Sequence, residues 1–338
     1  MVSDFALRIS DFPMMRIVFM GTGEIGVPAF RWLLGAHEVV AAVTQPDKPV
    51  GRKQELRASA IKQLAVERGV PVLQPVKLRA PESAAEIVAL RADVIVVMAY
   101  GQILPRTVLD AGRLACLNLH ASILPKYRGA APIQAAMEAG DARTGVTVMY
   151  MAEGLDTGDI LLIRETPIRR RDTGGSLHDR LAFVAADALA AALPLVEAST
   201  APRIPQDNAA ATLVTKLTRE NGAIDWSATA CAIERRIRAM NPWPAAHTSL
   251  PMPDGPRQLK LFGAIAHRRT RGAPGVVLRA DQRGLLVGAG EGAVLLREVQ
   301  LEGKRRMSAG EFLRGNPVAP GSLLGAGSSS SSSSSSSS

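Results

Sequence analysis

The stretch Cys116–Gly129, with the sequence CLNLHASILPKYRG, decides how the rest of the chain is interpreted. Its first part belongs to an apolar run, Leu114–Leu119, that we predict to be a buried strand. Asn118 and His120 are two residues apart, so their side chains share one face of that strand. After His120 the run breaks into a loop rich in serine, proline and glycine. Parallel sheets carry their chemistry at the carboxyl ends of strands, so we expect this pair at a substrate site.

A second polar segment, Gly154–Asp159 with the sequence GLDTGD, follows an apolar strand predicted at Gly145–Met151. It supplies Asp156, and an amide, an imidazole and a carboxylate together are suited to acyl transfer to an amine. Each group alone is ambiguous, since a histidine after a buried strand is more often a core residue. Asp156 and Asp159 also fit a simple turn or half of a cation site.

Apolar strands alternate with helices through the first 200 residues, which predicts a doubly wound, mostly parallel, Rossmann-like α/β sheet. The near-continuous apolar run Asp93–Ala99 is typical of a strand buried on both faces. The other predicted strands are Arg16–Met20, Glu38–Val43 and Pro71–Leu73, and the predicted helices begin near Gly21, Ala58, Pro81, Ala131 and Ser176.

Gly21–Gly26 has the form G-x-G-x-x-G after a strand, which is the dinucleotide-binding fingerprint. That function also needs an acidic residue at the end of the second strand, about 20 residues later. Here the second strand ends in Thr44 and Gln45, and the next acid, Asp47, lies in a proline-rich loop. We therefore interpret the glycines as a tight strand-to-helix turn.

The pattern changes after residue 203. Residues 204–220 are predicted as a linker, because the segment Ala201–Asn208 at their start has two prolines and no periodicity. Ser227–Met240 is predicted as a helix with Ile233, Ile237 and Met240 on one face. The short glycine-separated segments that follow predict a small antiparallel, OB-like β-barrel, and Ser308–Glu311 predicts a capping box for a last helix.

These patterns give five predicted regions. Residues 14–203 form a catalytic domain and 221–320 a C-terminal barrel domain, joined by the linker. Residues 1–13 are expected to be a disordered extension, with Met14 or Met15 as an alternative start, and 321–338 a disordered, serine-rich tail.

The chain of 338 residues carries a net charge of +9, and its positive charge is concentrated at the C-terminal side. From Ile204 onward there are 17 Lys and Arg against 10 Asp and Glu, a net +7, while the preceding residues have 23 against 21, a net +2. This asymmetry favours a polyanionic partner for the second domain. A basic protein without a nucleic-acid partner remains the plain alternative.

Cysteine and histidine are scattered, so no spaced set of metal ligands is present and we predict no metal site. Cys116 and Cys231 lie in separate apolar segments and are expected to be reduced thiols, which favours the cytoplasm. No apolar run approaches the roughly 18 residues that span a membrane, and the N-terminus has no signal or transit peptide pattern. A monomer is expected.

The motifs resemble those of the 10-formyltetrahydrofolate-dependent formyltransferases. The resemblance rests on NLH at Asn118–His120, SILP at Ser122–Pro125, YRG at Tyr127–Gly129 and GLDTG at Gly154–Gly158. Further motifs are similar to the branch of the family that formylates methionyl-tRNA, namely RGAAPIQ at 128–134, TQPD at 44–47 and NPWP at 241–244. The match runs from about Arg16 to Pro320. Gly23 departs from the family's usual Gly-Thr-Pro turn.

The resemblance implies a role for each motif. Asn118, His120 and Asp156 would be catalytic, with 10-formyltetrahydrofolate as co-substrate and initiator methionyl-tRNA as acceptor. The pocket for the folate donor would be lined by Ser122, Ile123, Leu124 and Pro125 and by the backbone of Met98, Tyr100 and Gly101. The polar loop Thr44–Gln54 would contact the tRNA acceptor end. The predicted tRNA-binding residues are Lys48, Arg52, Lys53, Arg235, Arg236, Lys304 and Arg305.

Three alternatives stay open. A sibling formyltransferase that acts on a nucleotide or nucleotide-sugar amine would share the catalytic residues. So would the hydrolase module of formyltetrahydrofolate dehydrogenase, which requires a long dehydrogenase domain in addition. A non-enzymatic RNA-binding protein would explain the charge but would leave the catalytic residues as a coincidence.

Overall fold

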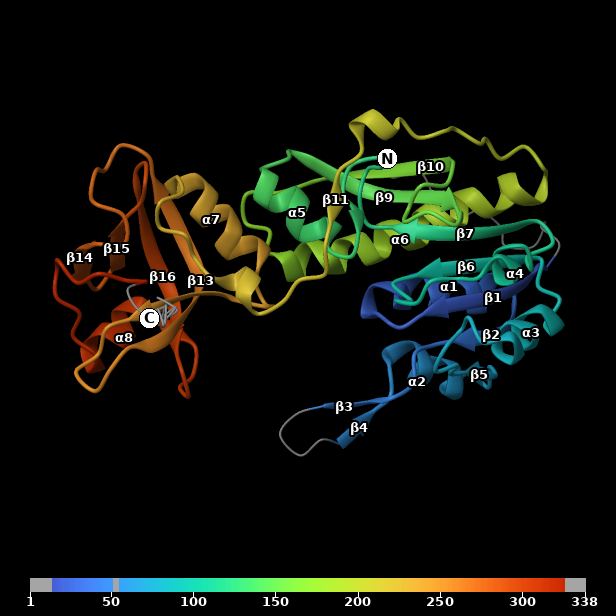
Figure 1. Cartoon of the computed structure of the whole chain (residues 1–338), viewed down its shortest axis with the longest axis horizontal. Coiled ribbons are helices and arrows are strands. Elements are labelled where there is room, and N and C mark those ends of the chain that lie inside the picture. Colours follow the sequence, from blue (N-terminus) through green and yellow to red (C-terminus); the bar gives the residue numbers. More distant parts are fainter. Residues whose placement is uncertain (1–13, 51–54, 326–338) are drawn as a thin grey trace, which may run out of the picture. The chain divides into compact units, whose positions relative to one another are not determined.

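The computed structural model describes residues 14–50 and 55–325, and its contacts divide the chain into two compact units (Figure 1). Unit 1 consists of Met1–Pro132, Ala142–Ile168 and Leu177–Thr215. Unit 2 consists of Ile133–Asp141, Arg169–Ser176 and Lys216–Ser338. Both terminal regions predicted as disordered fall largely outside the described residues, which also omit 51–54.

Unit 1 is built on a seven-stranded sheet with the order β10-β9-β7-β6-β1-β2-β5. In chain order these strands are β1 (Arg16–Gly21), β2 (Glu38–Val43), β5 (Val72–Leu73), β6 (Val94–Met98), β7 (Ala115–His120), β9 (Arg143–Tyr150) and β10 (Ile160–Pro167). The five strands from β7 to β5 pair in parallel. The predicted α/β class with a mostly parallel sheet is confirmed.

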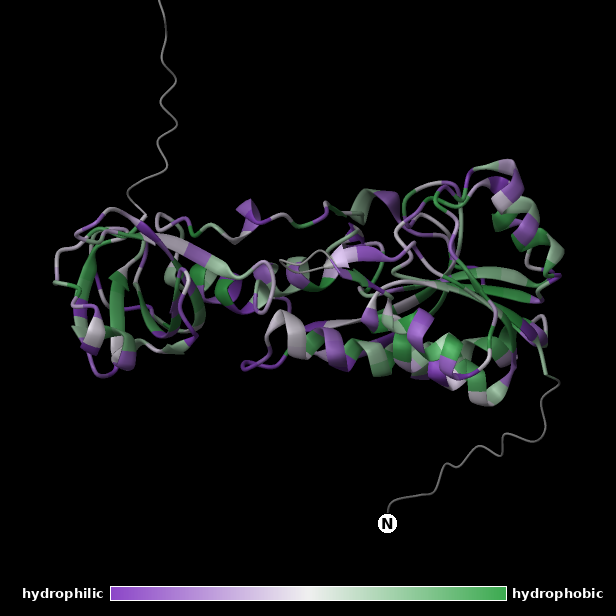
Figure 2. Ribbon diagram, turned by 90° about the horizontal axis from the view of Figure 1, so that it is seen from below, coloured by the Kyte–Doolittle hydropathy of each residue, from purple (hydrophilic) through white to green (hydrophobic). Residues whose placement is uncertain are grey.

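Helices lie on either side of this sheet (Figure 2). They are α1 (Val27–Ala36), α2 (Ala60–Glu67), α3 (Pro81–Ala89), α4 (Arg106–Leu109) and α6 (Gly174–Glu197), with α5 (Pro132–Ala139) almost wholly in unit 2. Short 3-10 helices occur at η1 (Glu24–Gly26), η2 (Asn208–Ala210) and η3 (Glu220–Gly222). With both faces covered, every residue of β6 is buried, as its continuous apolar sequence predicts.

The edge of the sheet beyond β7 is antiparallel, which the alternation of strands and helices does not predict. β9 runs antiparallel to β7, and β10 runs antiparallel to β9. The chain therefore leaves β9 at the end of the sheet opposite to the carboxyl end of β7. The loop after β9 has to turn back for Asp156 to approach His120.

The glycines of Gly21–Gly26 allow close packing rather than phosphate binding. The backbone N–H groups of Thr22 and Gly23 donate to the carbonyl of Ala99, at 3.2 and 3.3 Å. A Cβ atom on Gly21 would lie 2.7 Å from the ring of Phe19 and 2.9 Å from the carbonyl oxygen of Met98. The turn is thus pressed against the exit of β6, in agreement with its interpretation as a tight connection.

Two small two-stranded sheets complete unit 1. β3 (Lys48–Val50) pairs antiparallel with β4 (Glu55–Arg57). These two strands flank residues 51–54 of the predicted cationic loop. β8 (Arg128–Gly129) pairs in parallel with β11 (Leu213–Val214). Part of the segment that we predict as a linker is therefore paired within unit 1, next to the catalytic motifs. A two-residue strand has too little periodicity to be detected from sequence.

Unit 2 contains α7 (Ala230–Ala239), α8 (Ala309–Gly315) and an antiparallel sheet. Its strands follow the order β12-β13-β16-β15-β14, with β17 paired to β16. They are β12 (Ala246–Leu250), β13 (Arg257–His267), β14 (Val277–Asp281), β15 (Gly284–Gly288), β16 (Ala293–Leu301) and β17 (Met307–Ser308). The pairings describe an antiparallel sheet, and its closure into a barrel stays a prediction.

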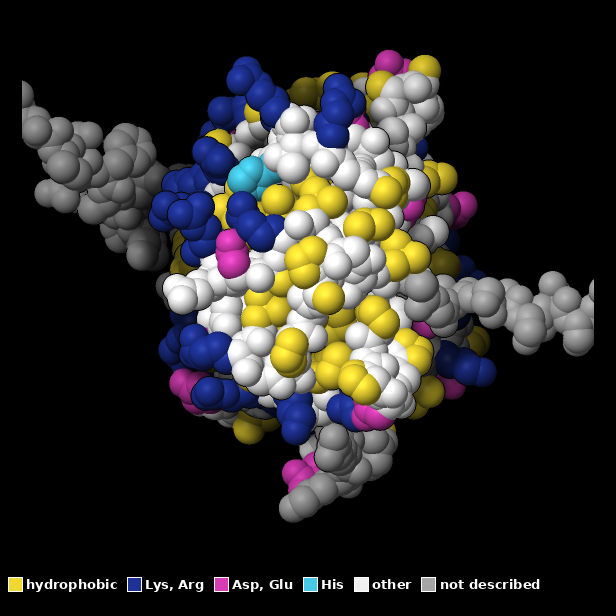
Figure 3. All heavy atoms as spheres, turned by 90° about the vertical axis from the view of Figure 1, so that its left-hand side faces the viewer, with side chains coloured by type: hydrophobic (Ala, Val, Ile, Leu, Met, Phe, Trp, Pro, Cys, Tyr) yellow, Lys and Arg dark blue, Asp and Glu magenta, His cyan; other side chains and the backbone are white. Residues whose placement is uncertain are grey.

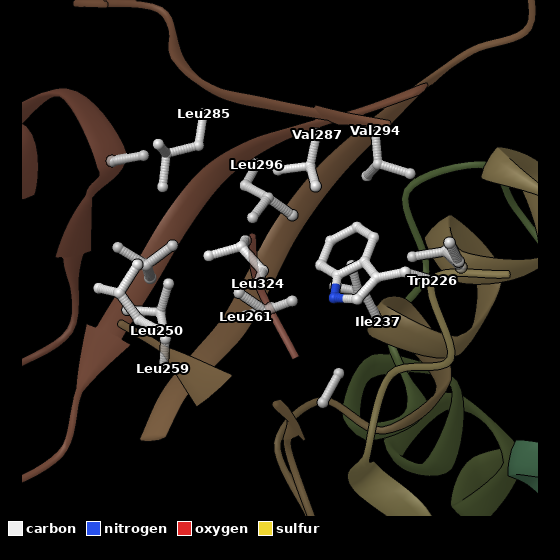
Figure 4. Packing of buried hydrophobic residues seen from close by; sticks show 14 of the residues in the cluster. Trp226, Ile237, Leu250, Leu259, Leu261, Leu285, Val287, Val294, Leu296 and Leu324 are labelled. Carbon is white, nitrogen blue, oxygen red and sulfur yellow. The ribbon is translucent and has the colours of Figure 1, made fainter. Parts of the chain in front are cut away.

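The core of unit 2 forms between this sheet and α7. The predicted stripe of Ile233, Ile237 and Met240 is buried, and each such side chain contributes about 1.5–3 kcal/mol by leaving water. Figure 4 shows Trp226 in the same cluster, beside leucines and valines of the strands. Its indole N–H donates to Thr248 Oγ1 at 3.0 Å, which satisfies the one polar group of the ring. The capping box at Ser308 and Glu311 is present.

Among the residues that the structure describes, no helix is long and apolar enough to cross a membrane.

Candidate active site

β7 presents three alternating side chains, Cys116, Asn118 and His120, on one face of the unit 1 sheet. The strand is positioned by its apolar residues, Leu117 and Leu119, which are buried on the opposite face. His120 is buried, whereas Asn118 is half-buried. The structure thus confirms that Asn118 and His120 share a strand face.

The loop after β9 turns back and brings Asp156 onto this face. Asn118 Nδ2 donates to Asp156 Oδ1 at 3.3 Å, and the backbone N–H of Gly129 donates to Asp156 Oδ2 at 2.8 Å. The distance from Asp156 Oδ2 to His120 Nδ1 is 3.5 Å. The three predicted catalytic residues are therefore brought together by the fold, although they come from separate segments.

The two ring nitrogens of His120 have different surroundings. Nε2 lies 2.9 Å from the carbonyl oxygen of Tyr127, and since a carbonyl only accepts, this nitrogen carries a proton that it donates. Tyr127 is itself held in place, because its backbone N–H donates to Thr212 Oγ1 at 2.7 Å. This leaves Nδ1, the nitrogen that faces Asp156, to gain and lose a proton.

The loop Ser122–Pro125 is braced from within. Ser122 Oγ donates to the carbonyl of Lys126 at 2.7 Å, and Thr147 Oγ1 bridges this loop by donating to the Ser122 carbonyl and accepting from the Leu124 N–H. Ser122 and Leu124 are buried, while Ile123 and Pro125 are half-buried. Of the predicted folate-lining residues here, the latter two offer accessible side chains.

Met98 and Tyr100 are also buried, and Gly101 is exposed. The side chains of Met98 and Tyr100 belong to the core, so this segment can offer a ligand mainly its backbone. The Tyr100 carbonyl already accepts from Thr22 Oγ1 and Gln45 Nε2, at 3.3 and 3.0 Å.

A cavity of about 600 Å³ lies near the start of β7, and its lining includes none of the three catalytic residues and none of the predicted folate-lining residues. Its lining includes Cys116 of β7 and Met151–Glu153, the first part of the loop that carries Asp156. Its volume falls in the range of small-molecule sites, roughly 300–1,000 Å³. Its lining is Arg106, Leu109, Asp110, Gly112, Leu114–Cys116, Tyr150–Glu153 and Arg203.

Charged and ionisable groups surround this cavity. Arg203 lies over the ring of Tyr150, 3.6 Å from its centre, and Arg106 pairs with Asp110 at 2.6 Å. Burial raises the pKa of the Cys116 thiol to about 12, so this sulfur stays protonated and is a poor nucleophile near neutral pH.

The structure describes no group of three or more His, Cys, Asp or Glu side chains that is able to hold a metal ion, within residues 14–50 and 55–325.

The hairpin β3–β4 is anchored at its base by polar contacts. Lys62 Nζ lies 2.7 Å from both Asp47 Oδ2 and Gln74 Oε1, and Gln74 Nε2 donates to Asp47 Oδ1 at 2.9 Å. The hydrogen bonds from Lys62 and Gln74 lower the pKa of Asp47. Lys48 Nζ donates to Gln45 Oε1. The predicted residues Arg52 and Lys53 lie outside the described part of the chain.

The predicted basic residues of unit 2 differ in their surroundings. Arg236 pairs with Glu138 at 2.9 Å and donates to the Asn221 carbonyl, and Arg235 is half-buried against Gly140. Lys304 and Arg305 are exposed. Figure 3 shows Lys and Arg side chains concentrated along one margin of a face of unit 2, next to an apolar area in its middle. Lys304 and Arg305 are thus the more accessible of the predicted pairs.

Sequence reasoning missed two polar residues that support the site. Thr147 braces the Ser122 loop, and Gln206 contacts the loop of Asp156. Thr147 lies inside an apolar strand and Gln206 in the predicted linker, so neither belongs to a motif. A polar residue in a fully buried strand is a signal that points to Thr147. No comparable signal marks Gln206.

Two domain families match this chain. Residues 15–193 match the formyl transferase domain, and residues 216–317 match the formyl transferase C-terminal domain. The fold is also similar to that of a solved N-formyltransferase from Helicobacter canadensis, in a complex with folinic acid and dTDP-3-aminofucose. That likeness has a TM-score of 0.61 at 17% identity and covers 84% of this chain and 99% of the other.

Curated relatives are much closer in sequence. The methionyl-tRNA formyltransferase of Stutzerimonas stutzeri is 48% identical over 314 residues, which cover 92% of this chain and 98% of the relative. That of Akkermansia muciniphila is 47% identical over 305 residues, covering 90% and 97%. Since both domains match in the same order and these relatives match over nearly their whole length, the chain belongs to the methionyl-tRNA formyltransferase family.

Proposed function

We propose that this enzyme transfers the formyl group of 10-formyltetrahydrofolate to the α-amino group of methionine on initiator tRNA. The observation that carries the proposal is the meeting of Asn118, His120 and Asp156 on one face of β7. The reaction belongs to translation initiation, and we propose a cytoplasmic location for the enzyme.

In this mechanism the amine nitrogen of methionine attacks the formyl carbon of the donor. Asn118 has two side-chain N–H groups, and only one is needed for Asp156. The second donates to the formyl oxygen as negative charge develops on it. The carbon–nitrogen bond to the folate then breaks, and the amine becomes a formamide.

His120 moves the proton that this exchange requires. Its Nδ1 accepts a proton from the attacking amine and delivers it to the departing folate nitrogen, so the balance closes without another reactant. The Tyr127 carbonyl holds the ring through Nε2, and the Asp156 carboxylate stabilises the imidazolium once Nδ1 has accepted the proton. With the thiol of Cys116 protonated, direct transfer without a covalent enzyme intermediate fits the site.

The cavity is our candidate position for the ring system of the folate donor. Its lining includes Cys116 and Met151–Glu153, which precede Asn118 and Asp156 in the sequence, but none of the predicted folate-lining residues. The folate complex of the similar Helicobacter canadensis enzyme supports a folate as the donor. Ile123, Pro125 and the Met98–Gly101 backbone remain proposed as further contacts.

An acceptor panel tests the proposed function. The protein is incubated with 10-formyltetrahydrofolate that carries a labelled formyl group, together with initiator methionyl-tRNA, elongator methionyl-tRNA, or an amino-sugar nucleotide such as dTDP-3-aminofucose. We expect the label chiefly on the initiator methionyl-tRNA. Labelling of the sugar nucleotide alone would replace the proposed acceptor, and no transfer to any acceptor would refute formyl transfer.

The hairpin loop is proposed to act on tRNA. We expect Arg52→Ala to raise KM for initiator methionyl-tRNA while KM for the folate donor stays within about twofold, since a cation that contacts phosphates adds affinity for RNA. Steady-state kinetics with each substrate varied in turn checks this. A rise confined to the folate KM would assign the loop to the donor instead.

Unit 2 is proposed to bind the tRNA through its phosphates. We expect Lys304→Gln/Arg305→Gln to weaken tRNA binding. The slope of log K against log salt should also become shallower by about 1–2, because fewer counterions are released from the RNA when phosphate contacts are lost. Filter binding over a series of salt concentrations measures both effects.

The matched control is Lys77→Gln/Arg79→Gln, which removes the same charge from two exposed residues of unit 1. We expect little change in this variant. If the control flattened the salt dependence equally, net charge rather than the surface at Lys304 and Arg305 would govern binding.

A further inference from the structure

Gln206 uses its whole side-chain amide to join two segments of the active site. Its Nε2 donates to the carbonyls of Asp156 and Gly158, at 2.8 and 2.7 Å. Its Oε1 accepts from Nε and Nη2 of Arg128, at 3.0 and 2.8 Å. A primary amide has two N–H groups and an oxygen with two lone pairs, so these four contacts fill its capacity, and Met149 Sδ is a more distant neighbour of Nε2 at 4.0 Å.

The other end of this connection is rigid. Arg128 is 5% exposed, and a buried guanidinium keeps its place only when its N–H groups are hydrogen-bonded. Besides Gln206, its Nη2 donates to Asn208 Oδ1 at 2.9 Å. The backbone of Arg128 is fixed by the pairing of β8 with β11. Gln206 is therefore held between a fixed cation and the loop of Asp156.

The loop that Gln206 holds has an unfavourable backbone at its key residue. Asp156 has a φ of +50°, in the left-handed region that side chains other than glycine seldom adopt. Two residues later, a Cβ atom on Gly158 would lie 1.7 Å from the carbonyl oxygen of Tyr150. Such a turn persists where surrounding contacts specify it, and the two hydrogen bonds from Gln206 fall on the peptide groups of these two residues.

We propose that Gln206 is a positioning residue for catalysis, which fixes the Asp156 loop so that the carboxylate stays within reach of Asn118 and His120. The proposal rests on the function proposed above. Gln206 contacts neither the reacting groups nor the imidazole, so it acts through Asp156. Its effect should appear in the rate of transfer rather than in substrate affinity.

Gln206→Glu is the sharpest variant. It keeps the shape of the side chain and the oxygen that accepts from Arg128, and it replaces the donor to both carbonyls by an acceptor. We expect kcat to fall by about 10²-fold, as a displacement of about 1 Å at a catalytic group does, with KM for both substrates within about threefold. Gln63→Glu is the matched control, since Gln63 also donates to a backbone carbonyl, that of Ala58, away from the site.

A double-mutant cycle separates positioning from a general structural role. Single-turnover transfer is measured for the wild type, Gln206→Glu, Asp156→Asn and the double variant, with folding checked by circular dichroism. If Gln206 acts through Asp156, the double variant is no slower than Asp156→Asn alone. Gln206→Met, which removes all four hydrogen bonds without adding charge, should give the same non-additive result if Gln206→Glu folds poorly.

Two outcomes would overturn the proposal: a Gln206→Glu enzyme with wild-type kcat, or the same loss in kcat in both backgrounds. These differ from a failure of the proposed function, in which the wild-type protein itself transfers no formyl group to methionyl-tRNA.

Discussion

Replacing His120 with alanine is expected to lower kcat for formyl transfer by about 10²–10⁴-fold, the usual contribution of a positioned acid–base group. The amine has to lose a proton as it attacks, and the folate nitrogen has to gain one as it leaves. His120 is suited to both steps, because its Nε2 is occupied by the Tyr127 carbonyl and its Nδ1 faces Asp156 at 3.5 Å. Rapid-quench measurement of one turnover, with both substrates saturating, isolates this step.

The control for His120→Ala is His178→Ala. His178 lies on α6 beside the exposed carboxylate of Asp179, at 3.0 Å. We expect its removal to leave kcat within about twofold, since surface substitutions have small effects. A folded His120→Ala enzyme with near-normal single-turnover transfer would show that another group carries the proton.

Replacing Asn118 with alanine is expected to lower kcat by about 10²–10³-fold, equivalent to about 3–4 kcal/mol, as the loss of one oxyanion donor does. The amide N–H strengthens its hydrogen bond only when the formyl oxygen becomes negative. The same change should therefore leave donor binding almost unaltered. The measurement pairs single-turnover kinetics with calorimetric binding of tetrahydrofolate, which lacks the formyl group.

Asn316→Ala serves as the control, because Asn316 donates to the Phe312 carbonyl at the end of α8 in unit 2. We expect full activity from it. If Asn118→Ala weakened tetrahydrofolate binding as strongly as it slowed transfer, Asn118 would be a ground-state contact of the folate and not an oxyanion donor.

The sequence predicts much of the fold because its signals there are local. Asp93–Ala99 is a continuous apolar run, and the helix with Ile233, Ile237 and Met240 repeats its apolar residues at the helical period. Both patterns depend only on neighbours in sequence, and both elements are present, β6 at Val94–Met98 and α7 at Ala230–Ala239. Element boundaries differ by a few residues, as expected where helix ends depend on caps.

Features that depend on distant pairing are not visible in the sequence. The apolar pattern of the strand Arg143–Tyr150 is compatible with a parallel or an antiparallel orientation. Only its pairing with β7 shows that it is antiparallel. Leu213–Val214 is a strand only because Arg128–Gly129 lies beside it. The grouping of Asn118, His120 and Asp156 is predicted from motifs, whereas the cavity and the contacts of Gln206 follow from the assembled sheet.

The position of Gln206 in the sequence also determines when the active site is completed during synthesis of the chain. Asn118, His120 and Asp156 leave the ribosome at least 50 residues before Gln206, and the β11 strand that pairs with β8 follows later still. Domains fold as their residues emerge, from the N-terminal side first. A nascent chain that ends at Arg203 already carries every reacting group but lacks the amide that fixes the Asp156 loop. The order of translation thus delays the completed site until the chain has grown past its own catalytic motifs.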